Sequence, residues 1–305
     1  MMAPLDVSCE VFEKCCLLGT VCGDRGTVWI SKHKPSSSRF VIKIYELEKC
    51  AEELDKIKDE IAMVRQLQHR NVIKYLASFT SDEQLWIVMP LIGYTSASRL
   101  VASHFNEGLS EVALSLILKD VLCGLQYLHS KGIIHRSIKG THILVDSNGR
   151  SLLCGFRHST SSISQGVWQK KIHSYPAEAS YNLNWASPEL LKQDTDGYCQ
   201  KTDIYSLGVT ICELGNGEVP YCKFEPQLIL VEKVYGREPF LHDVNTCRHL
   251  CDNGKDSGVG ESYGENLASL SRVTRKCFSP SAHAFVSSCL CADPSRRPSA
   301  SKLLE

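Results

Sequence analysis

The sequence predicts an α+β fold in which a small, sheet-rich lobe is followed by a larger helical lobe. In the first ninety residues, short β-rich runs alternate with polar turns, and only one stretch has helical spacing. From residue 96 onward, apolar residues return every three or four positions, which is the period of a helix. Separation of strands and helices into consecutive halves of a chain is typical of α+β folds.

The β-rich runs of the first half lie at residues 27–31, 40–45, 74–79 and 85–88. The sequence K-P-S-S-S-R at 34–39 predicts a turn between the first two runs. Between the second and third runs, residues such as Ile57, Ile61 and Val64 recur at helical spacing, which predicts a helix within 47–67.

In the second half, residues 110–130 have the strongest helical period, and Ser110-Glu111 suits a helix start. Further helices are predicted at 201–215, 285–290 and 300–304. Residues 252–271 are rich in Gly, Ser and acidic residues and poor in apolar ones, so we expect a flexible loop there.

The composition is that of a soluble globular protein with a full core. The chain has 305 residues, 43% of them hydrophobic, and its formal net charge is zero. Neutrality argues against a nucleic-acid partner, and no stretch approaches the roughly 20 apolar residues of a membrane span. The start of the chain does not resemble a signal peptide. The 15 cysteines are scattered through apolar segments, which indicates reduced intracellular thiols rather than disulfides or a metal site.

A series of short motifs runs along almost the whole chain. In order, they are V-I-K at 41–43, Glu60, H-R-N-V-I at 69–73, L-W-I-V-M at 85–89, H-R-S-I-K-G-T-H-I-L at 135–144, S-P-E at 187–189, D-I-Y-S-L-G at 203–208 and R-P-S at 297–299. The series resembles the ordered signatures of a protein kinase domain. The resemblance spans residues 12–304 and implies a two-lobed kinase-like fold, with a small lobe at 12–92 and a large lobe at 93–304.

Three positions that kinases use for chemistry hold other residues. Phosphoryl transfer needs a catalytic-loop Asp to accept a proton, and an Asn and a second Asp to hold magnesium. By the resemblance, these positions are Ser137, His142 and Cys154. A serine is a poor base at neutral pH, and magnesium prefers oxygen ligands. We therefore expect no catalytic residues, no bound metal and a pseudokinase that works by binding.

The residues around these positions lead to a hypothesis of ATP binding without magnesium and without hydrolysis. Lys139, His142 and Arg157 can carry positive charge in place of the metal, and Arg and Lys are natural phosphate partners. Lys43 and Glu60 can form the ion pair that orders the small lobe. The alternative is that this pair is only structural and the cleft is empty. The nucleotide contacts that the resemblance implies are Gly19, Val28, Lys43, Glu60, Met89, Lys139, His142 and Arg157.

The glycine-rich loop of kinases is degenerate here and allows two alignments. Counted back from Val28, its three glycine positions are Val21, Gly23 and Gly26, with the first glycine replaced. Counted forward from Gly19, the loop is two residues longer and Val21 occupies the second position. In both alignments, the β-branched Val21 weakens a loop that would cradle phosphates, and a plain strand-turn-strand fits equally well.

The structural residues of the kinase fold are retained. The resemblance implies that Glu189 and Arg297 form a buried ion pair in the large lobe. It also implies that Asp203, at the start of a helix, holds the backbone of the catalytic loop.

The match narrows to one family of pseudokinases. The residues that carry it are H-R-S-I-K-x-x-H-I-L at 135–144, W-x-S-P-E-L-L at 185–191, K-T-D-I-Y-S-L-G at 201–208 and F-S-P at 278–280. They resemble the STRAD family of sterile-twenty-related adaptors, and the beta member more closely. The resemblance implies a cytoplasmic and nuclear protein that binds and allosterically activates a serine/threonine kinase of the liver kinase B type. An armadillo-type scaffold protein of the Mo-twenty-five kind is the implied second partner.

The partner surface implied by the family is the segment 157–189, with Trp168, Tyr175 and Tyr181 as aromatic anchors. The alternative is an ordinary loop whose aromatic residues are tucked into the core. Family members continue into a Trp-Glu-Phe tail that docks the scaffold, whereas this sequence ends at Leu303-Leu304-Glu305. We therefore expect either a fragment or short isoform, or scaffold binding through the domain body alone.

Two other functions stay open from the sequence. Lys43, Glu60 and Lys139 favour a weak serine/threonine kinase with unusual metal handling, and a third possibility is a scaffold with an empty cleft. Ser257 and Ser262, flanked by acidic residues, resemble a phosphorylation-dependent degradation signal, although a solvated loop is the plainer interpretation.

Overall fold

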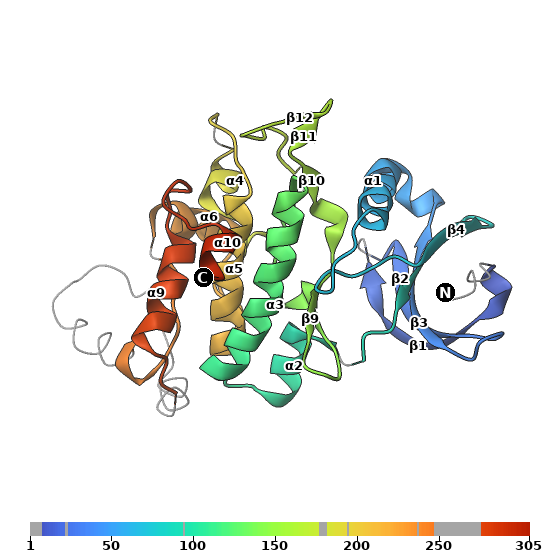
Figure 1. The fold of residues 1–305 in the computed structure, drawn as a ribbon, viewed down its shortest axis with the longest axis horizontal. Coiled ribbons are helices and arrows are strands. Elements are labelled where there is room, and N and C mark those ends of the chain that lie inside the picture. Colours follow the sequence, from blue (N-terminus) through green and yellow to red (C-terminus); the bar gives the residue numbers. More distant parts are fainter. Residues whose placement is uncertain are drawn as a thin grey trace.

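The computed structural model describes residues 8–21, 24–93, 95–176, 182–193, 195–236, 238–246 and 276–305. Figure 1 shows a lobe built on an antiparallel sheet beside a larger lobe of helices. The predicted two-lobed α+β fold is therefore confirmed. The expected flexible loop at 252–271, with Ser257 and Ser262, and the expected anchor Tyr181 lie outside the described residues.

The small lobe contains five antiparallel strands in the order β1-β2-β3-β5-β4. Their bounds are β1 Phe12–Val21, β2 Gly26–His33, β3 Arg39–Glu46, β4 Ala77–Ser81 and β5 Gln84–Pro90, and a short 3-10 helix, η1 Cys9–Val11, precedes them. The runs predicted for β2, β3 and β5 are correct to within two residues at each end. The run predicted at 74–79 is displaced, because residues 73–76 are irregular and β4 begins at Ala77. The sequence pattern did not predict β1, because most of its residues are exposed.

The two faces of this sheet carry different side chains. Ile42 and Trp86 belong to a cluster of buried apolar residues on one face. Because side chains alternate along a strand and paired residues point the same way, Val28, Lys43 and Met89 share the opposite face. Val28 pairs with Lys43 across β2 and β3, and Met89 pairs across β5 and β3 with Val41, two positions before Lys43. The nucleotide contacts expected in the sheet therefore lie on one face.

The predicted helix at 47–67 is an α-helix only in its second part. A 3-10 helix, η2 Glu48–Glu53, precedes α1 Leu54–Arg65. Ile57, Glu60 and Val64 form the buried face of α1 at the predicted spacing. Glu60 thus points inward from this helix.

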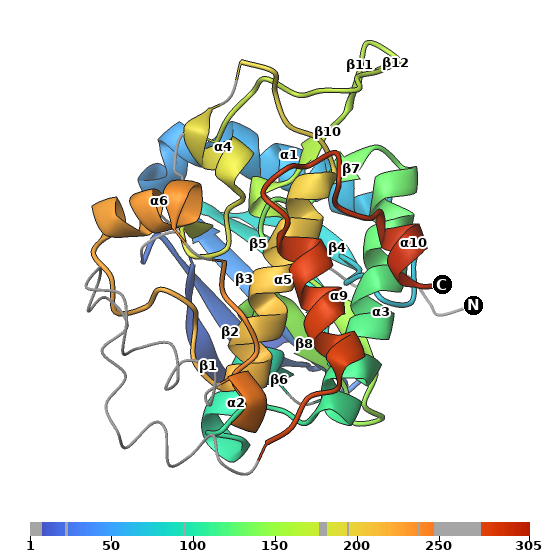
Figure 2. The same ribbon diagram turned by 90° about the vertical axis from the view of Figure 1, so that its left-hand side faces the viewer.

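The large lobe is organised around two long helices. Its helices are α2 Ala97–His104, α3 Glu111–Ser130, α4 Pro188–Lys192, α5 Lys201–Asn216, α6 Pro226–Tyr235, α9 Pro280–Leu290 and α10 Ala300–Leu303. In Figure 2, α9 runs along α5, with α3 beside them. The hydroxyl of Ser110 accepts a hydrogen bond from Ala113 N–H, which confirms the predicted start of α3. By length and hydropathy alone α3 could cross a membrane, but here its apolar face packs into the core of the large lobe.

Short strands and 3-10 helices connect these helices. They are β6 Thr95–Ser96, β7 Ile133–Ile134, η3 Gly140–His142, β8 Ile143–Val145, β9 Ser151–Leu153, η4 Phe156–His158, β10 Thr160–Ser161, β11 Ile163–Ser164 and β12 Val167–Trp168. β11 and β12 pair as a hairpin that projects from the large lobe in Figures 1 and 2. We call the residues from 163 to 168 the projecting hairpin.

Asp243 joins two parts of the large lobe that are far apart in sequence. Its carboxylate accepts hydrogen bonds from Thr246 N–H at 2.8 Å and Phe278 N–H at 3.0 Å, and it lies 2.9 Å from His283 Nε2. Burial raises the pKa of this carboxyl, but these hydrogen bonds outweigh burial and hold the pKa at about 2.

We expect Asp243→Asn to destabilise the chain by about 1–3 kcal/mol at pH 7. A carboxyl whose folded pKa lies below its unfolded value of about 3.9 stabilises the fold above that value and loses this effect as the pH falls toward 2. The difference between parent and variant should therefore shrink between pH 5 and pH 3 in urea unfolding. The exposed Asp55→Asn is the control, and a pH-independent difference would contradict this role for Asp243.

Candidate functional site

An ion pair joins the sheet to α1. Lys43 Nζ lies 3.3 Å from Glu60 Oε1, and the Tyr75 hydroxyl donates to the same oxygen at 2.5 Å. The ammonium also stands 4.9 Å from the centre of the Tyr45 ring. Burial lowers the pKa of Lys43, but Glu60 and the two tyrosines outweigh burial and hold that pKa well above its usual value. Lys43 is therefore positively charged at pH 7. Nothing in the sequence marked Tyr45 or Tyr75 for this role.

Ser137 and His142 face each other in the loop that would be catalytic in a kinase. His142 Nδ1 lies 2.8 Å from the carbonyl oxygen of Ser137 and 3.0 Å from its hydroxyl oxygen. Burial lowers the pKa of His142 well below its usual value, and the Lys139 ammonium acts in the same direction. His142 is therefore neutral at pH 7. The expectation that it carries positive charge toward a phosphate is corrected, because its surroundings disfavour the imidazolium.

Cys154 occupies the third changed position and is held by its backbone. Its N–H donates to the carbonyl of His142 at 2.9 Å, and its carbonyl lies 3.0 Å from His135 Nε2. Burial raises the pKa of the thiol to about 12, against the opposing effect of Lys43, so the thiol stays protonated. Within the described parts of the chain, no three His, Cys, Asp or Glu side chains gather closely enough to hold a metal ion.

Arg157 pairs with a buried carboxylate of the small lobe. Its Nη2 lies 2.5 Å from Glu53 Oε2, and Arg25 lies 3.5 Å from the other oxygen of Glu53. Glu53 is a buried carboxylate at the end of η2 that needs a positive partner. Arg157 therefore joins the start of α1 to the residues after Cys154, and its contact with a phosphate stays a prediction.

Lys139 is a partly buried cation at the base of the catalytic loop. Its ammonium stands 5.4 Å from the centre of the Trp185 ring. Burial lowers the pKa of Lys139, and Glu213 opposes that change. Of the three side chains expected to supply positive charge, His142 is neutral, Arg157 pairs with Glu53, and Lys139 lies over the Trp185 ring under the influence of Glu213.

The β1–β2 hairpin closes tightly at its end. Val21 pairs with Gly26, and Gly19 pairs with Val28. A side chain on Gly26 would lie 2.6 Å from the carbonyl of Ile44 and 2.9 Å from Val21 Cγ2, whereas one on Gly19 would meet nothing within 4 Å. The fold thus requires glycine at 26 but not at 19, and because Gly26 is the third glycine of both alignments, the choice between them stays open. Gly23 is not among the described residues.

Asp203, at the start of α5, binds the backbone of the catalytic loop through its carboxylate. Its carboxylate accepts hydrogen bonds from the backbone N–H groups of His135 at 2.9 Å and Arg136 at 2.8 Å. His129 Nε2 lies 2.8 Å away. Burial raises the pKa of Asp203, but these partners outweigh burial and lower it overall, so Asp203 is ionised. This is the placement that the sequence implied.

Arg136 connects this loop to the segment that follows Cys154. Its Nε donates to the carbonyl of His158 at 2.5 Å, and its Nη1 donates to the carbonyl of Ser174 at 3.2 Å and to the Tyr198 hydroxyl at 2.8 Å. The backbone of Arg136 has a φ of 58°, in the left-handed region. No motif in the sequence predicted these partners of Arg136.

Glu189 and Arg297 form a doubly hydrogen-bonded pair, with Oε1 2.6 Å from Nη1 and Oε2 2.9 Å from Nη2. Arg297 also donates to the carbonyls of Cys291, Ala292 and Lys201. The pair joins the end of the 157–189 segment to the loop before α10.

The two described aromatic residues of the expected partner surface differ in exposure. Trp168 is 48% exposed on the projecting hairpin. Tyr175 is partly buried and packs with its ring 5.4 Å from that of Tyr198. Trp168 can therefore meet a partner directly, whereas Tyr175 mainly supports the segment.

Comparison with known proteins matches residues 12–305 to the family described as "Protein kinase domain". The chain is 36% identical over 306 residues to STE20-related kinase adapter protein alpha of Bos taurus, covering 96% of this chain and 82% of that one. It is 36% identical to the alpha protein of Homo sapiens, covering 96% and 71%. It is also 36% identical to the beta protein of Homo sapiens over 292 residues, covering 91% and 70%. These identities do not place the chain nearer to the beta protein.

Proposed function

The chain belongs to the protein kinase domain family and, within it, to the STE20-related kinase adapters, and we propose that it is a pseudokinase that acts by binding. The supporting observation is the chemistry of three positions. Ser137 offers a hydroxyl, His142 a neutral imidazole and Cys154 a protonated thiol. None of these groups is an anionic oxygen that could accept the substrate's proton or bind magnesium. Loss of a general base alone costs about a hundred- to ten-thousand-fold in rate.

The proposed activity is allosteric activation of a partner serine/threonine kinase of the liver kinase B type. An armadillo-type scaffold of the Mo-twenty-five kind is the proposed second partner, and the cytoplasm and nucleus are the proposed locations. The word "adapter" in the names of the relatives supports the proposed activity. So does the 158–174 backbone, which Arg136 holds in place with Trp168 exposed.

The proposed ligand of the cleft is ATP, bound without magnesium and not hydrolysed. The side chains present fit such a ligand, because Val28 and Met89 supply apolar surface on the same sheet face as the charged Lys43. Lys139 adds a second cation from the large lobe. Bound ATP would supply negative charge for these two lysines to hold. Arg157 would join them only by leaving Glu53.

Thermal unfolding with ATP tests this proposal. A ligand present at 100 times its Kd stabilises the fold by about 2.7 kcal/mol, and we expect this stabilisation to persist in EDTA. Stabilisation that strictly needs magnesium, together with phosphoryl transfer in a radiolabelled ATP assay, would instead support a weak kinase, for which the intact Lys43–Glu60 pair is the favourable observation. No stabilisation in either condition would indicate a scaffold that binds no nucleotide.

A further inference from the structure

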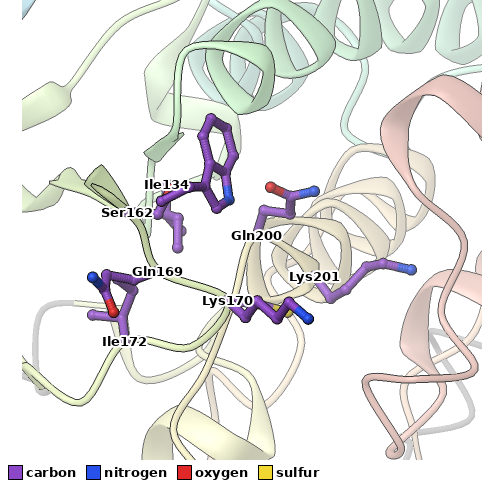
Figure 3. A pocket seen from close by; sticks show the side chains of 9 residues that line it. Ile134, Ser162, Gln169, Lys170, Ile172, Gln200 and Lys201 are labelled. Atoms are coloured by element: carbon purple, nitrogen blue, oxygen red, sulfur yellow. The ribbon is translucent and has the colours of Figure 1, made fainter. Parts of the chain in front are cut away.

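A cavity lies in the large lobe beside the projecting hairpin. It measures about 220 Å³ and lies between residues 168–172 and the start of α5, as Figure 3 shows. Ile134 and Ile172 supply apolar surface, Lys170 and Lys201 supply charge, and Cys199 also lines the cavity. We call this cavity the hairpin pocket, because Trp168 of the projecting hairpin is part of its wall.

The wall of the hairpin pocket is fixed by backbone hydrogen bonds. Ile172 and Tyr198 exchange two N–H to carbonyl bonds, at 2.8 and 3.0 Å. Gln169 N–H donates to the carbonyl of Ser162 at 2.7 Å, and Ser162 N–H donates to the carbonyl of Gly132 at 2.6 Å. A ligand would therefore meet a preformed site and would not have to order it first.

The lining of the hairpin pocket favours an anion. None of the described residues that line it is Asp or Glu, and its polar groups include the amides of Gln169 and Gln200. The ammonium of Lys201 is already used, because it donates to the carbonyl of Arg297. Lys170 is exposed and forms no ion pair with any residue that the structure describes. Gln200 and Lys201 also stand at the N-terminal, positive end of the 16-residue α5.

The projecting hairpin beside the pocket is apolar, and the segment that carries it has no acidic residue. Val167 is 60% exposed and Trp168 is 48% exposed on the projecting hairpin. The sequence from 157 to 176 contains no Asp or Glu, whereas it holds Lys170 and Lys171. An apolar anchor beside a positively charged cavity complements an acidic partner surface.

We propose that the hairpin pocket receives a Glu or Asp side chain of the partner kinase, with the carboxylate at Lys170 and the aliphatic stem against Ile134 and Ile172. A carboxylate suits one available ammonium and neutral amides. Phosphate recognition favours an arginine fork, and the described lining residues of this pocket include no arginine. This inference rests on the proposed function, which supplies the partner, and it adds the chemistry of one contact.

Charge reversal at Lys170 tests the contact, with its neighbour Lys171 as the matched control. Lys171 is exposed and does not line the pocket. Using a kinase of the liver kinase B type and its scaffold, we expect Lys170→Glu to raise the Kd by at least about tenfold, because it places two negative charges together. Lys171→Glu should change the Kd by less than about threefold. Equal losses for both variants, or no loss for Lys170→Glu, would overturn the proposal.

A measurement without the kinase separates failure of the pocket from failure of the proposed function. Cys199 is partly exposed in the hairpin pocket, so its alkylation by iodoacetamide, followed by mass spectrometry, reports occupancy. The probe is N-acetylglutamate α-amide, and its neutral control is N-acetylglutamine α-amide, both at on the order of 50 mM and constant ionic strength.

We expect the acidic probe to slow alkylation of Cys199 at least about twofold, and Lys170→Ala to remove that protection. Equal protection by both probes, or none by either, would overturn the pocket's assignment even if the kinase binds. If the parent chain does not bind the kinase, the proposed function fails, and the alkylation result still decides whether the pocket takes a carboxylate.

Discussion

Replacing Glu189 by alanine is expected to destabilise the large lobe by about 3–5 kcal/mol, because the variant leaves a buried charge without its partner. The Arg297 side chain is 0% exposed, so water cannot replace the lost carboxylate. Three backbone carbonyls would still accept hydrogen bonds from the guanidinium, but they carry no net charge. Glu189 also raises the pKa of the buried Lys233, against the larger opposing effect of burial. Removing Glu189 therefore also disfavours the charged form of Lys233. Urea unfolding at pH 7 gives the change in free energy.

The matched control is the exposed ion pair near the end of the chain. Lys302 Nζ lies 2.7 Å from Glu305 Oε2, but the two side chains are 69% and 67% exposed. Lys302→Ala should therefore change the free energy of unfolding by less than about 1 kcal/mol. If Glu189→Ala costs no more than Lys302→Ala, the buried pair does not have the structural role assigned to it.

Lys43→Ala is expected to abolish the stabilisation of the chain by ATP. The variant removes the cation on the sheet face that carries Val28 and Met89, and leaves Glu60, a buried carboxylate, to repel phosphate. At an ATP concentration 100 times the parent's Kd, the loss would be about 2.7 kcal/mol, which corresponds to several degrees in Tm. Parallel thermal scans of parent and variant, with ATP and EDTA, measure it.

Two further variants make this result interpretable. Lys32→Ala removes an exposed lysine from β2 of the same sheet and should keep the full ATP effect. Lys43→Ala can lower the Tm without ATP, because it breaks the pair with Glu60, so only the difference made by ATP is compared. A variant that gains as much stability from ATP as the parent would exclude Lys43 from the nucleotide site.

The sequence predicted those features that depend on local pattern or on the order of motifs. The period of α3 and the capping residue Ser110 are local signals, and both are confirmed. The Glu189–Arg297 pair lies between segments far apart in sequence, and only the kinase resemblance could have joined them. α6 was missed because its sequence, P-Q-L-I-L-V-E-K-V-Y, has a run of apolar residues without a helical period.

The site was less predictable where charge depends on the surroundings. His142 and Arg157 were both read as cations free to meet a phosphate. Burial makes His142 neutral, and Arg157 instead meets Glu53, a residue from the small lobe with no motif around it. Neither effect leaves a local trace in the sequence, because a pKa and an ion-pair partner are set by the folded packing.

The bonds of Arg136 have a consequence for how this protein can be controlled. In kinases whose activation loops are ordered by phosphorylation, the added phosphate supplies the anion that arginine side chains hold. Here Arg136 donates instead to the carbonyls of His158 and Ser174 and to the Tyr198 hydroxyl. These acceptors belong to the chain itself and need no modification. The 158–174 backbone is thus held without phosphorylation by an upstream kinase, and a phosphatase has no phosphate there to remove.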